Sequence, residues 1–94
     1  MQKVIERKRY DTEKALLIAS DYFWDGHNWE RNCRNEYLYK TKKGNFFLYK
    51  TTIWEGEVNN IVALGKTEAM DAYEQLLVKK VEWETAFDEE TEEA

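Results

Sequence analysis

The sequence predicts an α+β domain: a small antiparallel β-sheet with a central hairpin, covered on one face by a C-terminal helix. Two segments rich in aromatic and β-branched residues flank Lys42-Lys43-Gly44, as in a β-hairpin. Apolar residues after Thr67 recur at spacings of three and four, as in a helix with one buried side. The chain has 94 residues, so we expect a single domain over residues 1–87, followed by a flexible acidic tail, residues 88–94.

The hairpin also has a predicted register. A three-residue loop whose last member is a left-handed glycine places Thr41 opposite Asn45. The strand pairs are then Tyr39 with Phe47, Leu38 with Leu48, Tyr37 with Tyr49 and Glu36 with Lys50. Aromatic residues therefore meet aromatic residues and opposite charges meet, and both kinds of cross-strand pair stabilise a sheet.

The segments before the hairpin are less regular. Residues 4–10 are expected to form one strand with a charged face, which Asp11 and Thr12 end as a turn or helix cap. Residues 13–20 have a short, continuous apolar block, which is compatible with a short helix or a buried strand beside the hairpin. Residues 21–35 alternate between polar and aromatic without a clear period, so we expect a variable loop there.

After the hairpin, residues 60–64 predict another short strand, and Gly65 ends it. Thr67 is the expected N-cap of a helix over residues 67–80, with carboxylates in the first turn and lysines in the last. Its apolar stripe comprises Ala69, Met70, Tyr73, Leu76, Leu77 and Val81. Trp83, Ala86 and Phe87 continue a similar spacing, so this helix either continues or restarts there.

Cysteine content and hydropathy bear on the compartment. Cys33 is the only cysteine, so an intramolecular disulfide is impossible and a reducing interior is expected. The longest uninterrupted apolar run, residues 15–19, is too short for a signal peptide core or a membrane span. We therefore expect a cytoplasmic protein without a membrane partner.

Three segments together suggest a family. They are Tyr10-Asp11-Thr12-Glu13-Lys14-Ala15, the hairpin from Leu38 to Leu48, and Thr67-Glu68-Ala69 at the start of a helix. With them the chain resembles a widespread family of small uncharacterised bacterial and phage proteins that carry a Y-D-T-E-x-A segment and an L-Y-[RK]-T-K-x-G-x-[FW]-F-L hairpin. The resemblance covers most of residues 8–90 and implies an origin in a phage or mobile element. Such proteins commonly follow the hairpin with a glycine-rich segment, whereas this chain has residues 49–54, Tyr-Lys-Thr-Thr-Ile-Trp.

No motif in the sequence predicts catalysis, a cofactor or a metal. Gly65-Lys66-Thr67 matches the end of a phosphate-binding loop, but position 60, where that motif needs glycine, is asparagine. His27 and Cys33 lie at a spacing that matches no recognised site, and a structural zinc needs four good ligands. We therefore expect a protein that is not an enzyme.

Basic residues interleaved with aromatic rings form the one notable constellation. The bases are Arg7, Lys8, Arg9, Lys40, Lys42, Lys43 and Lys50, and the rings are Tyr37, Tyr39, Phe46, Phe47 and Tyr49. A sheet that presents rings and cations can stack bases and bind phosphates. The alternative is that the rings form the core of a small domain and the lysines are ordinary solvated residues.

Charge is unevenly spread along the chain. The net charge is −5, yet residues 82–94 contain seven acids and no base, which leaves fourteen bases and twelve acids in the rest. A strip of carboxylates can imitate a phosphate backbone and occupy a basic nucleic-acid channel. Alternatively, it is a solubilising tail.

Two functions follow from these observations and from the resemblance. The first is a binding or inhibitor protein of a phage or mobile element, such as an anti-CRISPR-type inhibitor of a host defence nuclease, with a protein partner. The second is a small nucleic-acid-binding module that uses the basic aromatic hairpin, with the acidic tail as an intramolecular competitor. The expected partner-binding residues are Tyr37, Tyr39, Lys42, Lys43, Glu89 and Glu90.

Overall fold

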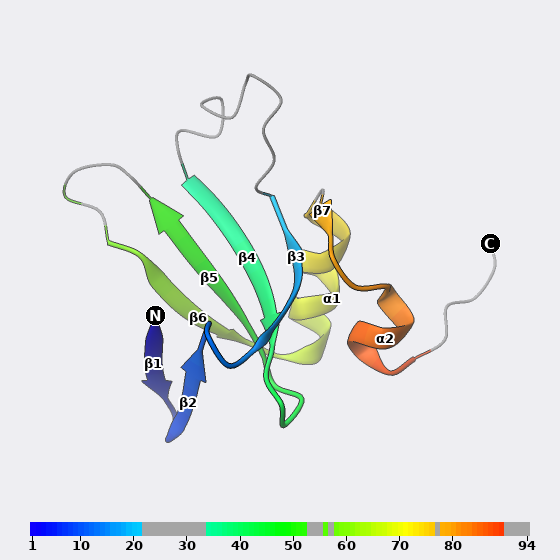
Figure 1. Ribbon diagram of the computed structural model, residues 1–94, viewed down its shortest axis with the longest axis horizontal. Coiled ribbons are helices and arrows are strands. Elements are labelled where there is room, and N and C mark those ends of the chain that lie inside the picture. The colour runs from blue at the N-terminus through cyan, green and yellow to red at the C-terminus, as the bar shows by residue number, and fades with distance from the viewer. Residues whose placement is uncertain (22–33, 53–55, 57, 77, 90–94) are drawn as a thin grey trace.

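A computed structural model of the chain describes residues 1–21, 34–52, 56, 58–76 and 78–89. Figure 1 shows the elements in this part of the chain. In chain order they are β1 (Gln2–Ile5), β2 (Lys8–Asp11), β3 (Leu16–Ser20), β4 (Arg34–Lys40), β5 (Phe46–Thr52), β6 (Asn60–Leu64), α1 (Lys66–Gln75), β7 (Val78–Lys79) and α2 (Trp83–Phe87).

The main sheet has the strand order β6-β5-β4-β3-β7, with antiparallel pairing throughout. The hairpin β4–β5 is therefore central, and α1 packs against one face of the sheet (Figure 1). Strands β1 and β2 form a separate two-stranded antiparallel sheet. The predicted α+β fold is confirmed. Along the described ranges, no helix is long and apolar enough to cross a membrane.

The predicted register of the central hairpin is confirmed. Each of the four predicted strand pairs occurs in β4–β5. The backbone N–H of Thr41 donates to the carbonyl oxygen of Asn45 at 2.7 Å, and Gly44 has a φ of 87°. The rings of Tyr39 and Phe47 stack with centroids 5.1 Å apart and planes 7° apart. Turn geometry and ring pairing thus favour the same register.

The single strand expected at residues 4–10 is wrong, because the chain reverses there. Strands β1 and β2 pair with Ile5 opposite Lys8, and the two residues between them have positive φ, 50° for Glu6 and 69° for Arg7. A two-residue hairpin turn demands such angles, and Asn and Gly adopt them most readily. Because Glu and Arg are not typical of this turn, the sequence carries no signal for it.

The structure decides part of what the sequence left undecided in residues 13–20 and 21–35. Residues 16–20 form a strand rather than a helix, and Ile18 and Ala19 are fully buried in it. The variable loop expected at residues 21–35 is too long, because Arg34 and Asn35 already belong to β4. Most of that predicted loop lies outside the described residues.

Helix α1 is shifted and shorter than predicted. Thr67 is not the N-cap: Gly65 occupies that position, and its N–H donates to the Glu68 carboxylate at 3.1 Å. The helix ends at Gln75, because the chain becomes extended at the next residue and then pairs as β7 with β3. Lys79 nevertheless reaches the helix end, where its ammonium group donates to the carbonyl oxygens of Tyr73 and Leu76.

The described residues form one core cluster on each face of the main sheet. The helical face buries Ile18, Ala19, Leu38, Phe46, Ala69, Tyr73, Leu76, Ala86 and Phe87. The other face buries Tyr10, Phe47 and Ile61. Phe46 and Phe47 enter different clusters because successive residues of a strand point to opposite faces. Helix α2 is the restarted helix that the sequence allowed, and its Phe87 lies in the first cluster.

Candidate functional site

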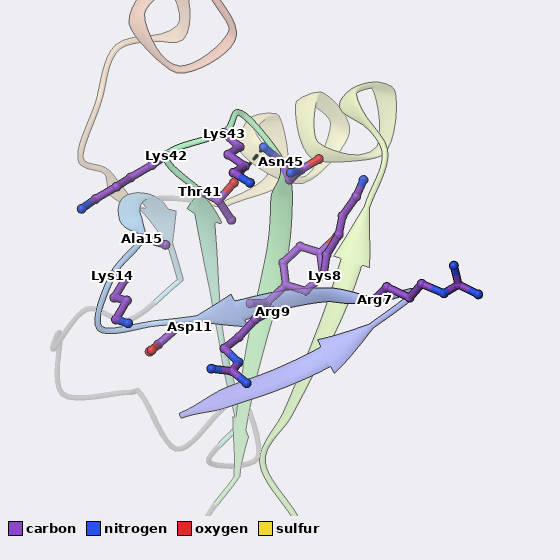
Figure 2. A pocket seen from close by; sticks show the side chains of 11 residues that line it. Arg7, Lys8, Arg9, Asp11, Lys14, Ala15, Thr41, Lys42, Lys43 and Asn45 are labelled. Atoms are coloured by element: carbon purple, nitrogen blue, oxygen red, sulfur yellow. Dashed lines mark hydrogen bonds between the residues drawn. The ribbon is translucent and has the colours of Figure 1, made fainter.

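A pocket of about 460 Å³ lies between the β1–β2 hairpin and the β4–β5 loop (Figure 2). Among the described residues, six basic side chains and one acidic side chain line it. The bases are Arg7, Lys8, Arg9, Lys14, Lys42 and Lys43, and the acid is Asp11. Segments that are distant in the sequence thus line one pocket, and their charged groups are spread around it (Figure 2).

The floor of this basic pocket is held by an aromatic contact. Tyr10 is 5% exposed, and its ring packs edge-to-face on Phe47 with centroids 5.4 Å apart. At the other strand, the Lys3 ammonium donates to the Asn60 side-chain oxygen at 2.8 Å and so ties β1 to β6. These contacts fix the small hairpin on the main sheet and place Lys8, two residues from Tyr10, at the pocket.

A turn after β2 positions Lys14. The Asp11 carboxylate accepts from the N–H of Glu13 at 2.9 Å, and the Asp11 carbonyl accepts from the N–H groups of Lys14 and Ala15 at 3.2 and 3.1 Å. Asparagine and aspartate favour such turns because their side chains bond to the backbone two residues on. Asp11 therefore positions Lys14 through backbone hydrogen bonds, and Asp11 also lines the pocket.

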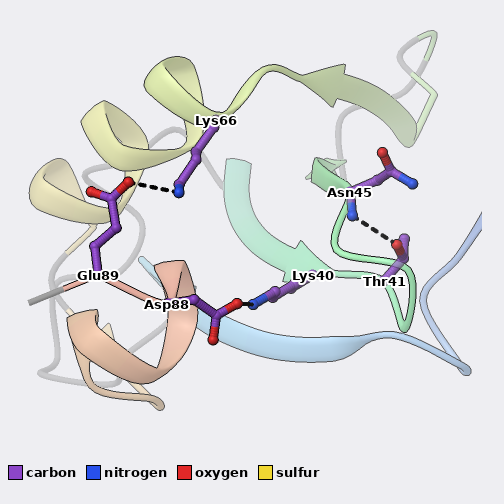
Figure 3. Close-up of polar contacts among 6 residues, drawn as sticks. All are labelled: Lys40, Thr41, Asn45, Lys66, Asp88 and Glu89. Atoms are coloured by element: carbon purple, nitrogen blue, oxygen red, sulfur yellow. Dashed lines mark hydrogen bonds and ion pairs between the residues drawn. The ribbon is translucent and has the colours of Figure 1, made fainter.

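The opposite wall is the β4–β5 loop. The Thr41 hydroxyl accepts from the N–H of Asn45 at 3.0 Å (Figure 3), and the N–H of Gly44 donates to the Thr41 carbonyl at 2.9 Å. The loop is therefore closed on itself, and Lys42 and Lys43 are exposed at its tip. This arrangement presents two cations on a constrained backbone.

In the described part of the chain, no cation of the basic pocket forms an ion pair. Within the described ranges, the two ion pairs join Lys40 to Asp88 and Lys66 to Glu89, and neither involves a pocket residue. Like charges that are brought together raise the local positive potential and attract anions. An anion with several negative groups is the ligand that this arrangement favours.

The expected partner-binding residues fall in different places. Lys42 and Lys43 line the basic pocket. Tyr37 and Tyr39 are partly buried on the sheet face opposite the helices, and the pKa of Tyr39 is raised by its burial and by Tyr49. Glu89 forms its ion pair with Lys66 (Figure 3), and Glu90 lies outside the described residues.

The wider basic and aromatic constellation divides in the same way. Phe46 and Phe47 are buried, so their rings form core and do not offer a stacking platform. Lys40 pairs with Asp88, and Lys50 lies in β5 opposite Asn60, away from the pocket. Sequence reasoning missed Lys14. The turn at Asp11 could be predicted, but the sequence did not show that this turn places Lys14 at the pocket.

Other chemistry finds no support in the described part of the chain. There, no group of three His, Cys, Asp or Glu residues could hold a metal ion. Lys66, from the partial phosphate-loop motif, begins α1 and pairs with Glu89. His27 and Cys33 lie outside the described residues. Comparisons of the chain with protein-family models, curated proteins and solved structures found no match.

Proposed function

We propose that this protein is a non-enzymatic nucleic-acid-binding module that contacts phosphates through the basic pocket. The observation that carries this proposal is that six basic residues and one acidic residue line a pocket of about 460 Å³. Polyphosphate backbones bind such surfaces because each neutralised phosphate releases condensed counterions. Cations on two separate elements, the β1–β2 hairpin and the β4–β5 loop, suit a ligand with several regularly spaced charges.

The composition of the pocket favours contacts to the backbone over contacts to bases. Among the described residues of the lining, Tyr10 is the aromatic one, and its buried ring is already engaged by Phe47. Single-strand binders stack bases on exposed rings, whereas sequence-independent duplex binders need cations that reach phosphates. Duplex nucleic acid is therefore the preferred ligand class.

The net charge of −5 is compatible with this function. Seven of the nineteen acids lie in residues 82–94, so the rest of the chain carries a small positive excess. Exposed charges are screened over a Debye length of about 10 Å at 0.1 M salt, so a polyanion responds mainly to the local surface. The local surface at this pocket is cationic.

The inhibitor function stays a prediction. It relies on carboxylates that would occupy the basic channel of a partner. Of the tail acids, Asp88 and Glu89 are described, and both pair with lysines of their own domain. The geometry therefore favours the nucleic-acid module.

Binding of a short duplex DNA, followed by fluorescence anisotropy at about 50 to 200 mM salt, tests the proposal. Six phosphate contacts predict a slope of about −5 for log K against log salt, since each contributes about −0.9. In the double variant Lys42→Gln/Lys43→Gln, the slope should become shallower by about 2 and the affinity should fall.

The matched control is Lys50→Gln/Lys80→Gln, which removes two exposed lysines away from the pocket. Its slope should remain close to that of the wild type. The proposal is overturned if the wild type fails to bind at low salt or if both double variants lose affinity equally.

A further inference from the structure

Two further lysines lie at the same end of the main sheet as the basic pocket. Lys40 ends β4, just before the β4–β5 loop, and Lys66 begins α1, just after β6. Figure 1 shows that the end of β4, the start of β5, the end of β6 and the β1–β2 turn gather at one end of the fold. This basic end, defined as the pocket cations plus Lys40 and Lys66, therefore extends beyond the pocket.

The two added lysines are neutralised by the first acids of the C-terminal segment. The Lys40 ammonium lies 3.0 Å from a carboxylate oxygen of Asp88, and the Lys66 ammonium lies 2.7 Å from one of Glu89 (Figure 3). Both acids directly follow α2, whose Phe87 is buried in the core. Packing of α2 thus holds the carboxylates at the basic end.

The acids of both ion pairs are open to solvent. The Asp88 side chain is 83% exposed and its partner Lys40 is 16% exposed, whereas the side chains of the Lys66–Glu89 pair are both about half exposed. Exposed ion pairs contribute little free energy, because water and salt compete for both partners. Each carboxylate contacts its lysine through one oxygen atom, as a phosphate oxygen could.

We propose, resting on the proposed function, that the nucleic-acid surface continues from the basic pocket across the β4–β5 loop to Lys40 and Lys66. In the free protein Asp88 and Glu89 occupy these lysines, and duplex phosphates displace them on binding. Thr41 lines the pocket and Lys40 precedes it on the opposite face of β4, so the loop separates two cationic sides. A duplex laid over the loop tip contacts both.

The test is the double variant Asp88→Asn/Glu89→Gln, which keeps the side-chain sizes and removes both competing charges. Asparagine also tolerates the left-handed backbone of residue 88, where φ is 54°. With the same short duplex DNA as probe, the affinity should rise by roughly three- to thirtyfold. The salt slope should steepen by up to about 2, because the wild-type carboxylates take up cations when phosphates displace them and the neutral side chains do not.

The matched control is Asp71→Asn/Glu74→Gln, which removes two exposed acids of α1 that form no ion pair with a lysine of the basic end in the described residues. Lys40→Gln/Lys66→Gln completes a mutant cycle. In the wild type these lysine changes should alter affinity less than twofold, whereas in the acid-neutralised protein they should abolish the gain.

The outcomes separate this inference from the proposed function. If the wild type binds the duplex but Asp88→Asn/Glu89→Gln binds no better, the inference is overturned while the function stands. An equal gain in the control means that net charge alone is responsible, which also overturns it. If neither protein binds at low salt, the proposed function itself is lost.

Discussion

The hydroxyl of Tyr73 donates a hydrogen bond of 2.8 Å to the carbonyl oxygen of Val81. This bond links α1 to the segment between β7 and α2. Trp83 and Phe87 pack edge-to-face on the same ring, with centroids 5.6 Å away in each case. The Lys79 ammonium lies 4.8 Å from the ring centroid. Tyr73 therefore connects α1 to α2 on this face of the sheet.

Tyr73→Phe removes the hydroxyl and keeps the ring contacts. We expect the free energy of unfolding to fall by about 0.5 to 1.5 kcal/mol, because the partly buried carbonyl of Val81 loses its donor. Urea unfolding measures the change. Tyr49→Phe is the control, since the Tyr49 oxygen accepts a bond from the exposed amide of Asn59. Equal losses in the two variants would contradict this role of Tyr73.

Alkaline pH should reduce the contribution of Tyr73. Burial, together with the nearby Glu84 and Glu82, raises the pKa of Tyr73 above its usual value of 10.0. The unfolded chain then ionises first, so stability is lost as the pH rises above about 10. The stability difference between wild type and Tyr73→Phe should therefore shrink from about pH 8 to about pH 11 in urea unfolding. A difference that is constant or grows over this range would contradict the raised pKa.

Gly44→Val tests the hairpin loop. A Cβ at this glycine meets nothing within 4 Å, so the cost comes from the left-handed backbone alone. A β-branched residue there costs on the order of 1–2 kcal/mol, whereas Gly44→Asn should cost less. Thermal unfolding compares the two. Gly65, with an ordinary φ of −73°, provides the control substitution Gly65→Ser, which keeps a favoured N-cap residue and should have little effect. An unchanged melting temperature for Gly44→Val would contradict the strain.

Leu76→Ala tests the buried side of the helical layer. Leu76 is 4% exposed within the main core cluster, so truncation should cost about 2–5 kcal/mol. The preceding Gln75 is exposed, and Gln75→Ala should be nearly neutral. Urea unfolding of both variants shows whether Leu76 is buried against the sheet while Gln75 faces solvent. Equal effects would mean that Leu76 lies outside the core.

Two truncations test where the fold ends. A chain that ends at Phe87 loses the two exposed ion pairs of Asp88 and Glu89 and should unfold at nearly the wild-type urea concentration. A chain that ends at Glu82 also loses Trp83 and the buried Phe87, and should be destabilised by more than about 3 kcal/mol. If the chain that ends at Phe87 unfolds as readily as the chain that ends at Glu82, the C-terminal acids belong to the fold.

The central hairpin shows how much local sequence can determine. Residues 34–52 contain both strands and their turn, so the register depends on the left-handed Gly44 and on directly paired rings, all within nineteen residues. The same holds for α2, where Trp83 and Phe87 share one helical side. These features follow from backbone dihedral preferences and short-range pairing, which a sequence pattern carries directly.

Other features were decided by contacts between distant segments. The β1–β2 turn uses Glu6 and Arg7 at positive φ, a conformation that the packing of Tyr10 on Phe47 holds in place. Helix α1 ends at Gln75 because β3 offers a partner strand to the residues that follow. In both places burial and strand pairing outweigh local propensity.

The basic pocket is the clearest case of this division. The sequence by itself determined that the domain is α+β, that Lys42 and Lys43 lie at a hairpin tip, and that acids gather at the C-terminus. Only the tertiary structure brought Lys14 and residues 7–9 to that tip and set Asp88 against Lys40. The physical reason is that the hydrophobic packing of distant segments decides which charged residues become neighbours. The burial of Tyr10 and Phe87 against the two faces of the sheet carries these charges to one end of the molecule.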